Sequence, residues 1–349
     1  MKIKQIIKQE IMSHPWLYAI GQIIRNRNDS EYLEQILGIK NNPRIVCLED
    51  YQPGIRSVPK CDIVAGTGND GFFACIRWAL DGVYFCKKYG FDPIVHFPEN
   101  SLYKDSSMPK NVNPFNYYYC EIGNKKGEKN ILSSRIKFMP RNSLLAEYLN
   151  QGISYRVSDK YIDEMSLVMK EYFHFNSKTL IYLENAINKY KINKNVLGVH
   201  VRGTDYRGNY ANHPTFIEPS VYYQYIDEAI RKYSFDRIFL ATDDKEILQE
   251  FLNHYGNEKI IYNPDVKRGS DNIGIHVIDS VNGNRNGYEK GLEVIGDMYI
   301  LSSCGGIISS MSQVALISRI YKKSRNETFT YDYIIDKGIN SNKKIFDKK

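Results

Sequence analysis

The chain has 349 residues, of which 42% are hydrophobic and 25% are charged, and its formal net charge is +7. This composition is that of an ordinary globular protein, and the length favours two domains over one. No stretch approaches the roughly 18 to 20 apolar residues that a membrane span needs, and the N-terminal region lacks a signal-peptide core. The sequence therefore predicts a cytoplasmic protein without a transmembrane segment.

The six cysteines include no CxxC pair, which favours reduced thiols over a zinc site or a disulfide framework. The basic residues are spread along the chain and indicate a solvated surface. Attraction to phosphorylated ligands, or peripheral association with an anionic membrane face, stays open. The 28 tyrosines accompany no recognisable nucleic-acid-binding motif, so nucleic acid is not expected as a partner.

The first half begins with a strand–helix–strand pattern. The segment "CDIVAGTGNDG" from Cys61 predicts a short strand and a glycine turn, followed by a long helix that ends at Gly90 and by the strand "DPIVHF". From Lys104 to Gly127 the chain is rich in Pro, Asn and Tyr, which predicts a long excursion on the surface. Helical patterns return at "DKYIDEMSLVMKEYFHF" and "SKTLIYLENAINKYKI".

Strands and helices alternate more clearly in the second half. The predicted strands are "NVLGVHVRG", "DRIFLATDD", "KIIYNPD" and "GGIISS", and each is separated from the next by at least one helical pattern. This alternation predicts an α/β protein whose parallel sheet is covered on both faces. We expect the boundary between the halves within Phe175–Asn195, which gives domains of residues 1–180 and 181–349.

Polar residues follow three of these strands at the point where each strand ends. Because ligands bind beyond the carboxyl ends of parallel strands, we expect these residues to line one site. The residues in the first strand and after it are two apart and share one face of the extended chain. In chain order the set is His200, Arg202, Thr204, Thr242, Asp243, Asp244, Ser309, Ser310 and Ser312.

The chemistry of this set suits a diphosphate. A serine-rich turn at a helix N-terminus offers backbone N–H groups and a positive dipole, and an arginine adds a planar, permanently charged fork. Each feature alone has a structural alternative. Arg202 and Asp205 can form an ion pair, the serines can cap a helix, and one of Asp243 and Asp244 can be an N-cap. Their coincidence at one edge favours a ligand site.

A rival interpretation rests on "GTGNDG", Gly66–Gly71, which is a literal GxGxxG between a strand and a helix and would suggest an NAD(P)-dependent oxidoreductase. The acidic residue expected about 20 positions later is not clearly present. Thr67, Gly68, Asn69 and Asp70 then form either a turn for close helix packing or a loop that faces the cleft. A non-catalytic protein that binds a sugar nucleotide or a glycan is a third interpretation.

The second half also resembles a known family. "HVRGTD", "FLATDD" and "DMYILSSCGGIISSMSQV" are similar, in this order, to the three motifs of the GDP-fucose-dependent fucosyltransferase superfamily, especially its α1,6-fucosyltransferases. The similarity covers about Val196 to Tyr321. It implies a GT-B fold, in which two Rossmann-like domains face each other across a cleft and the second, residues 181–349, binds the nucleotide sugar. The first domain would then face the acceptor.

The resemblance also implies the reaction, an inverting, metal-independent transfer of fucose from GDP-fucose to a hydroxyl of a glycan or glycoconjugate. By position, Arg202 matches the arginine that grips the β-phosphate, and Ser312 matches the serine that hydrogen-bonds it. His200 and Asp297 match contacts on the guanine side. The acidic pair of the second motif, which has a partly structural role in the family, is matched by Asp243 and Asp244. The other implied donor-binding residues lie beside these positions and are Thr242, Ser310 and Gln313.

The sequence departs from the α1,6 enzymes in three respects. Gly203 stands where they usually carry a second arginine, and the third motif is about one residue shorter. Their proposed base, a glutamate a few residues after the HxRxxD motif, has no counterpart in "YRGNYANHP". The transfer needs a base for the acceptor hydroxyl and stabilisation of the leaving GDP. Asp205 is the nearest carboxylate in sequence and our candidate base, and Glu218, Asp70 or an acceptor-side residue are alternatives.

Overall fold

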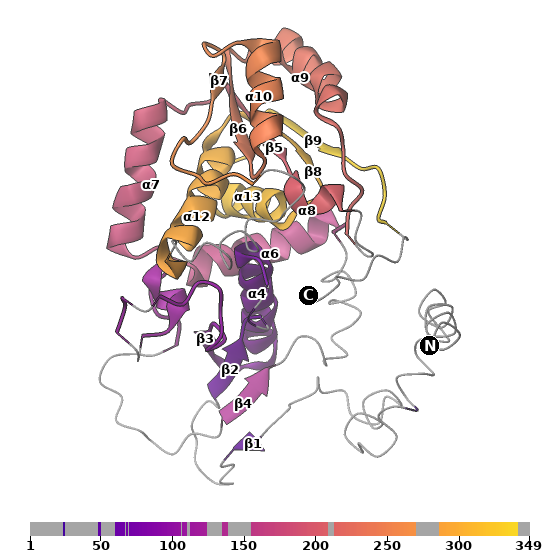
Figure 1. The fold of residues 1–349 in the computed structure, drawn as a ribbon. Helices are drawn as coiled ribbons and strands as arrows, with labels where there is room; N and C mark the ends of the chain where they lie inside the picture. The colour runs from indigo at the N-terminus through magenta and orange to yellow at the C-terminus, as the bar shows by residue number, and fades with distance from the viewer. Residues whose placement is uncertain are drawn as a thin grey trace.

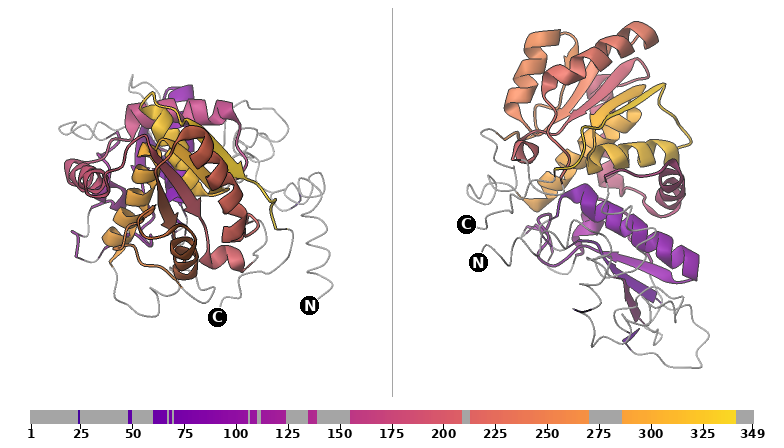
Figure 2. Two further views of the ribbon diagram at one scale, coloured as in Figure 1. Left: turned by 90° about the horizontal axis from the view of Figure 1, so that it is seen from above. Right: turned by 90° about the vertical axis from the view of Figure 1, so that its right-hand side faces the viewer.

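The chain folds into two units, each built on its own sheet, with helices packed between them (Figures 1 and 2). The computed structural model describes most residues from 60 to 340. The described residues are 24, 48–49, 60–66, 68, 70–105, 107–109, 112–123, 135–138, 155–208, 213–269 and 286–340.

The first unit contains a four-stranded sheet with the order β1-β4-β2-β3. Strand β2 pairs in parallel with both β3 and β4, and β1 pairs antiparallel with β4. The long helix α4 connects β2 to β3 and ends at Gly90, which adopts the left-handed conformation with φ 74°. The predicted strand–turn–helix–strand pattern is therefore confirmed. The elements are β1 (Leu48–Glu49), β2 (Lys60–Val64), α4 (Phe72–Tyr89), β3 (Asp92–His96) and β4 (Arg135–Phe138).

The surface excursion predicted for Lys104 to Gly127 is wrong in its described part. A short 3₁₀ helix, η1 (Pro114–Tyr117), leads into a buried aromatic cluster in which Phe115, Tyr118 and Tyr119 are at most 1% exposed. The rings of Phe115 and Tyr119 stack with centroids 5.0 Å apart, and the Tyr118 hydroxyl donates to two carbonyls at the start of α12. Burial of these rings outweighs the local preference of Pro and Asn for exposed turns.

The second unit contains a five-stranded, fully parallel sheet with the order β7-β6-β5-β8-β9. The central strand β5 is buried at all six positions, as the predicted apolar run requires. The four predicted strands are confirmed, whereas the edge strand β9 was not anticipated. The strands are β5 (Val196–Val201), β6 (Arg237–Thr242), β7 (Ile260–Ile261), β8 (Gly306–Ser310) and β9 (Tyr331–Ile335).

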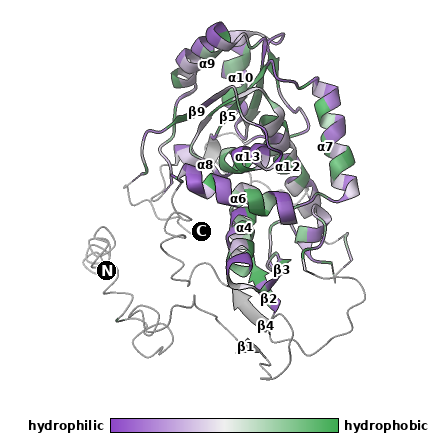
Figure 3. Ribbon diagram, turned by 180° about the vertical axis from the view of Figure 1, so that it is seen from behind, coloured by the Kyte–Doolittle hydropathy of each residue, from purple (hydrophilic) through white to green (hydrophobic). Residues whose placement is uncertain are grey.

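The helices predicted after residue 158 are confirmed, and the four-residue helix α8 was not anticipated. Figure 3 shows hydrophilic and hydrophobic residues alternating along α6, α7 and α9, as expected for helices with one face on the core. No described helix is long and apolar enough to cross a membrane. These helices are α6 (Asp159–Tyr172), α7 (Ser177–Tyr190), α8 (Thr204–Arg207), α9 (Pro219–Tyr233), α10 (Lys245–Tyr255), α12 (Gly287–Ser303) and α13 (Gln313–Ser324).

The core of the first unit extends into helices of the second. Apolar residues of α4 and α6 form one buried cluster with Met298 of α12 and with Leu316, Ile317 and Ile320 of α13. Helix α13 packs against α6, α4 and α12, and Figure 1 shows α6 lying between α4 and α13. The predicted α/β class is therefore confirmed, and the two units share a continuous apolar interface.

Candidate functional site

The carboxyl ends of β5, β6 and β8 meet at one edge of the second sheet. The parallel register sets Val201 beside Thr242 and His200 beside Ser309. The polar residues that follow the three strands therefore leave the sheet at the same level, as the alternation of strands and helices predicted. The helices α8, α10 and α13 begin directly beyond this edge.

Arg202 is held at this edge by Asp243. One guanidinium nitrogen of Arg202 lies 2.8 Å from Asp243 Oδ2, and the other carboxylate oxygen accepts a 2.8 Å hydrogen bond from the Gly203 N–H. The Arg202 side chain is 31% exposed and that of Asp243 is 10% exposed. The arginine is thus fixed by a nearly buried carboxylate while its own side chain stays partly exposed. Asp243, which directly follows the neighbouring strand β6, is thus a partner of Arg202, and the side chain of the nearby Asp205 lies outside the described part of the structure.

Gly203 has a steric reason to replace the second arginine of the α1,6 motif. A Cβ atom at Gly203 would lie 2.3 Å from the Cβ of Asp244 and 2.6 Å from its Oδ2. Only glycine fits here without a shift of the neighbouring strand end. This departure from the motif therefore follows from the close contact between the segments after β5 and β6.

Asp244 has the structural role that was one of its two predicted roles. It caps α10, since its Oδ1 accepts hydrogen bonds from the backbone N–H groups of Glu246 at 2.9 Å and Ile247 at 3.1 Å. Its Oδ2 accepts from Arg207 Nε at 3.2 Å, and the residue is 3% exposed. Thr242 supports the same turn, because its hydroxyl accepts from the Asp244 N–H at 3.3 Å.

Ser312 and His200 form the second part of the site. The Ser312 hydroxyl caps α13 by accepting from the Ala315 N–H at 3.1 Å, and it lies 3.3 Å from His200 Nδ1. Burial, with help from the positive charges of Arg202 and Arg319, lowers the pKa of His200 to about 3. The imidazole is therefore neutral at physiological pH. The positive end of the α13 dipole and the Arg202 fork thus flank the same sheet edge.

The two serines before Ser312 lie deeper. Ser309 is 0% exposed, and its hydroxyl accepts from Arg319 at 3.1 Å. Ser310 is 3% exposed, and its hydroxyl neighbours that of Tyr222, whose pKa is raised by burial. Of the serine turn, Ser312 therefore has the clearest position for contact with a ligand, and a donor contact by Ser310 stays a prediction.

Asp297 lies on α12 near a cation that the sequence analysis missed. Burial raises the pKa of Asp297 to about 7, with Glu293 and Asp243 acting in the same direction and Arg268 opposing them. The Arg268 guanidinium donates to two backbone carbonyls of its own loop at 3.0 Å. The next residue, Gly269, donates to the Asp243 carbonyl at 2.8 Å, so this loop borders the site. The only sequence signal was the basic pair in "PDVKRG" after the third strand.

The glycine loop of the first unit approaches the same region. Gly66 and Gly68 have φ values of 115° and 107°, and a Cβ at Gly68 would lie 2.2 Å from the Asn100 amide. A tight turn that requires glycine is therefore confirmed at these two positions. Burial raises the pKa of Tyr103, and two weaker effects, from Arg202, which lowers this pKa, and from Asp70, which raises it, indicate that Tyr103 lies near both groups. Thr67 and Asn69 of the predicted cleft loop lie outside the described residues.

An aromatic group borders Arg202 on another side. The guanidinium carbon of Arg202 lies 5.8 Å from the centroid of the Tyr206 ring, and the His213 ring lies 6.1 Å from that of Tyr206. The Tyr206 hydroxyl donates to the Met311 carbonyl at 3.3 Å, which ties α8 to the serine turn. The alternative base Glu218 is exposed and precedes the first residue of α9. Within the described ranges, no group of three His, Cys, Asp or Glu residues is arranged to hold a metal ion.

Comparison with known families identifies the chain. Residues 131–316 match the sequence profile of the alpha-(1,6)-fucosyltransferase N- and catalytic domains. This match spans more than half of the chain and contains Arg202, Asp243 and Ser312. The chain belongs to the α-(1,6)-fucosyltransferase family. No curated protein matches it. Membership of this family makes the chain a glycosyltransferase, so the interpretation as an oxidoreductase is wrong.

Solved structures similar to this fucosyltransferase carry related names. NodZ α-1,6-fucosyltransferase soaked with GDP-fucose is 15% identical over 76% of this chain and 93% of its own, with a TM-score of 0.44. NodZ from Bradyrhizobium is 15% identical over 76% and 92%, with a TM-score of 0.43. POFUT1 in its apo form is 10% identical over 81% and 99%, with a TM-score of 0.42.

Proposed function

We propose that this fucosyltransferase moves fucose from GDP-fucose to a hydroxyl of a glycan or glycoconjugate, with inversion and without a metal ion. The observation that carries the proposal is the pairing of Arg202 with Asp243 beside the N-terminus of α13. Two oriented positive groups, a guanidinium fork and a helix N-terminus, suit the two phosphates of a nucleoside diphosphate. The match to the α-(1,6)-fucosyltransferase family supports fucose as the sugar.

In this proposal, Arg202 provides the electrostatic stabilisation of the leaving group. The fork binds the β-phosphate and stabilises the charge that develops on GDP as the glycosidic bond breaks. The neutral His200 and the half-buried Asp297 lie on the guanine side, and Ser312 hydrogen-bonds the phosphate. The base that takes the proton of the acceptor hydroxyl is Asp205 in this proposal, because it follows Arg202 closely. We also propose that residues 181–349 bind the donor and that residues 1–180 face the acceptor.

The donor assignment is tested with a panel of nucleotides. GDP and GDP-fucose should raise the melting temperature, and UDP-sugars and NAD should not, because a wrong base leaves buried polar groups unpaired at about 1 to 3 kcal/mol each. Thermal shift with saturating ligand measures this, and the Arg202→Ala variant serves as the control that should lose the GDP response. Stabilisation by NAD or UDP-sugars without GDP would refute the donor assignment.

The absence of a metal requirement is tested by chelation. The two adjacent carboxylates of the site have other roles, since Asp243 pairs with Arg202 and Asp244 caps α10. A guanidinium and a helix dipole can stabilise the leaving diphosphate in place of a cation. Turnover of GDP-fucose should therefore be unchanged in excess EDTA. Loss of activity that Mn²⁺ or Mg²⁺ restores would show that the transfer depends on a metal.

The cytoplasmic location stays a prediction of the sequence.

A further inference from the structure

A buried polar network connects the first unit to the serine turn of the second. Arg77 of α4 is 1% exposed, yet it lies in the apolar cluster shared by α4, α6 and α13. Its Nε donates to the Tyr161 hydroxyl at 3.2 Å, and its Nη1 donates to Gln313 Oε1 at 3.3 Å. The Tyr161 hydroxyl donates in turn to Asp81 Oδ1 at 2.8 Å. Three helices from distant parts of the chain therefore meet at one guanidinium.

Filling a core with this polar network costs free energy compared with apolar side chains. Burial removes a guanidinium and a carboxylate from water, and apolar residues of similar volume often pack as well or better. Asp81 Oδ2 has no hydrogen-bond partner among the described residues, and burial raises the pKa of this carboxyl to about 6. Unlike an apolar core, the network fixes the orientation of the helices, because each hydrogen bond sets the rotation of one helix against the next.

The bond between Arg77 and Gln313 joins the two helices that follow the two loops of the site. Arg77 lies in the second turn of α4, which begins just after the glycine loop Gly66–Gly71. Gln313 is the first residue of α13 and directly follows Ser312, whose hydroxyl contacts His200. A rotation or shift of the first turn of α13 would break the bond to Arg77 and the contact between Ser312 and His200 together.

We propose that Arg77 is a positioning residue of the donor site, which acts through Gln313 to hold the first turn of α13 against α4, the helix that follows the glycine loop. It touches no reacting atom. This inference rests on the proposed function for its link to GDP, but the contact itself can be tested without a ligand. A purely structural arginine would affect stability alone, whereas a positioning residue also changes the affinity for the diphosphate.

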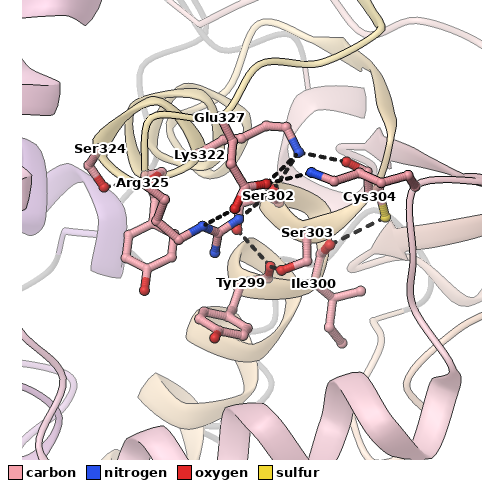
Figure 4. A network of polar contacts seen from close by, with 11 residues as sticks. Tyr299, Ile300, Ser302, Ser303, Cys304, Lys322, Ser324, Arg325 and Glu327 are labelled. Carbon is pink, nitrogen blue, oxygen red and sulfur yellow. Dashed lines mark hydrogen bonds and ion pairs between the residues drawn. The ribbon is translucent and has the colours of Figure 1, made fainter.

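The same helix offers a matched control at its other end. Lys322 is also 1% exposed, and its Nζ donates to the carbonyls of Ser302 at 3.0 Å and Cys304 at 2.8 Å (Figure 4). These bonds close the C-terminal end of α12, nearly three turns of α13 away from Ser312. Lys322→Met therefore removes a buried cation from the same helix without a direct effect on the serine turn.

The experiment compares Arg77→Met and Lys322→Met below their melting temperatures. Calorimetric titration with GDP should show a rise in Kd of about tenfold or more for Arg77→Met and a change of less than about twofold for Lys322→Met. Tyr161→Phe, which removes one hydroxyl, should give a smaller rise and serves if Arg77→Met does not fold. Equal GDP affinities of wild type and folded Arg77→Met would overturn the proposal.

Two further measurements make the result specific. If Arg77 acts through Gln313, the double variant Arg77→Met, Gln313→Ala should bind GDP no more weakly than the worse single variant. A Kd raised by the product of the two single effects would show that Arg77 does not act through Gln313. Hydrogen exchange should accelerate in the first turn of α13 in Arg77→Met and in its last turn in Lys322→Met. Unchanged exchange at the first turn would refute the positioning role even if wild type binds no GDP. Failure of wild type to bind GDP would refute the proposed function instead.

Discussion

At the scale of single residues, the site depends on which carboxylate holds the arginine. Asp205 is the carboxylate closest to Arg202 in the sequence, and the structure brings Asp243, which follows the neighbouring strand β6, into an ion pair with Arg202. Asp243 is only 10% exposed and also accepts the Gly203 N–H. The carboxylate therefore orients the guanidinium as well as balancing its charge, which is what a preorganised phosphate clamp needs.

Arg202→Lys should be almost as damaging as Arg202→Ala. A lysine keeps the charge but loses the planar fork that can contact Asp243 and a phosphate together. We expect the rate of GDP-fucose turnover to fall by a factor on the order of 10² or more in both variants. Arg202→Ala should also lower the melting temperature, because it leaves the nearly buried Asp243 carboxylate without its cation. Steady-state kinetics and thermal unfolding measure the two effects.

Two variants accompany this experiment. Arg231→Lys, at an exposed position in the last turn of α9, is the same substitution away from the site and should be fully active. Asp243→Asn should lower turnover as well, because the amide no longer balances or orients the guanidinium. A stable and fully active Arg202→Lys enzyme would show that Arg202 is not the diphosphate clamp.

At the scale of elements, periodicity predicts the long helices and the buried strands but not the short or atypical segments. The helices α9, α10 and α13 combine an apolar stripe with a turn or cap signal, so the sequence predicts their positions. Helix α8 has only four residues. Strand β9 is a five-residue edge strand in which the half-buried Tyr331 and Tyr333, whose rings contact tyrosines of α9, alternate with exposed residues. Neither carries enough residues of one pattern to predict it.

The buried segment around η1 shows the opposite failure. Its Pro and Asn residues are typical of surface turns, and Asn113 does cap the short helix. The neighbouring rings nevertheless pack against Phe72, Phe97 and Phe173. The density of Phe and Tyr in "NPFNYYY" was the available signal, because several aromatic side chains in succession are rarely left in water.

At the scale of the whole molecule, buried ionisable groups link the site to global stability. His200 is 5% exposed and its pKa is lowered to about 3. In the unfolded chain the imidazole takes up a proton near its ordinary pKa of about 6.5. Between these two pKa values the unfolded state binds more protons than the folded state. The free energy of unfolding is therefore at its full value above about pH 6.5 and falls below it by about 1.4 kcal/mol per pH unit.

His200→Gln should reduce this sensitivity to acid. Glutamine can still approach Ser312 with a polar atom but takes up no proton. Urea unfolding at pH 7 and pH 5 should show a loss of stability that is about 2 kcal/mol smaller in the variant than in wild type. Equal losses in both proteins would mean that His200 is protonated in the folded state.

The sequence by itself determined the class of the fold and the identity of the chain. The α/β alternation, the parallel second sheet and the polar residues after β5, β6 and β8 follow from periodicity and from the rule for ligand sites. The motifs around Arg202, Asp243 and Ser312 identified the family. These features are local, because strand ends, helix caps and motifs are encoded within a few adjacent residues.

Only the tertiary structure decided how distant residues combine. It brought Asp243 into an ion pair with Arg202, assigned Asp244 to the cap of α10, and brought Arg268 to the edge of the site. It also joined Arg77 to Gln313, which are 236 residues apart. No local pattern encodes such pairs, because sheet register and helix packing bring them together only after the chain has folded.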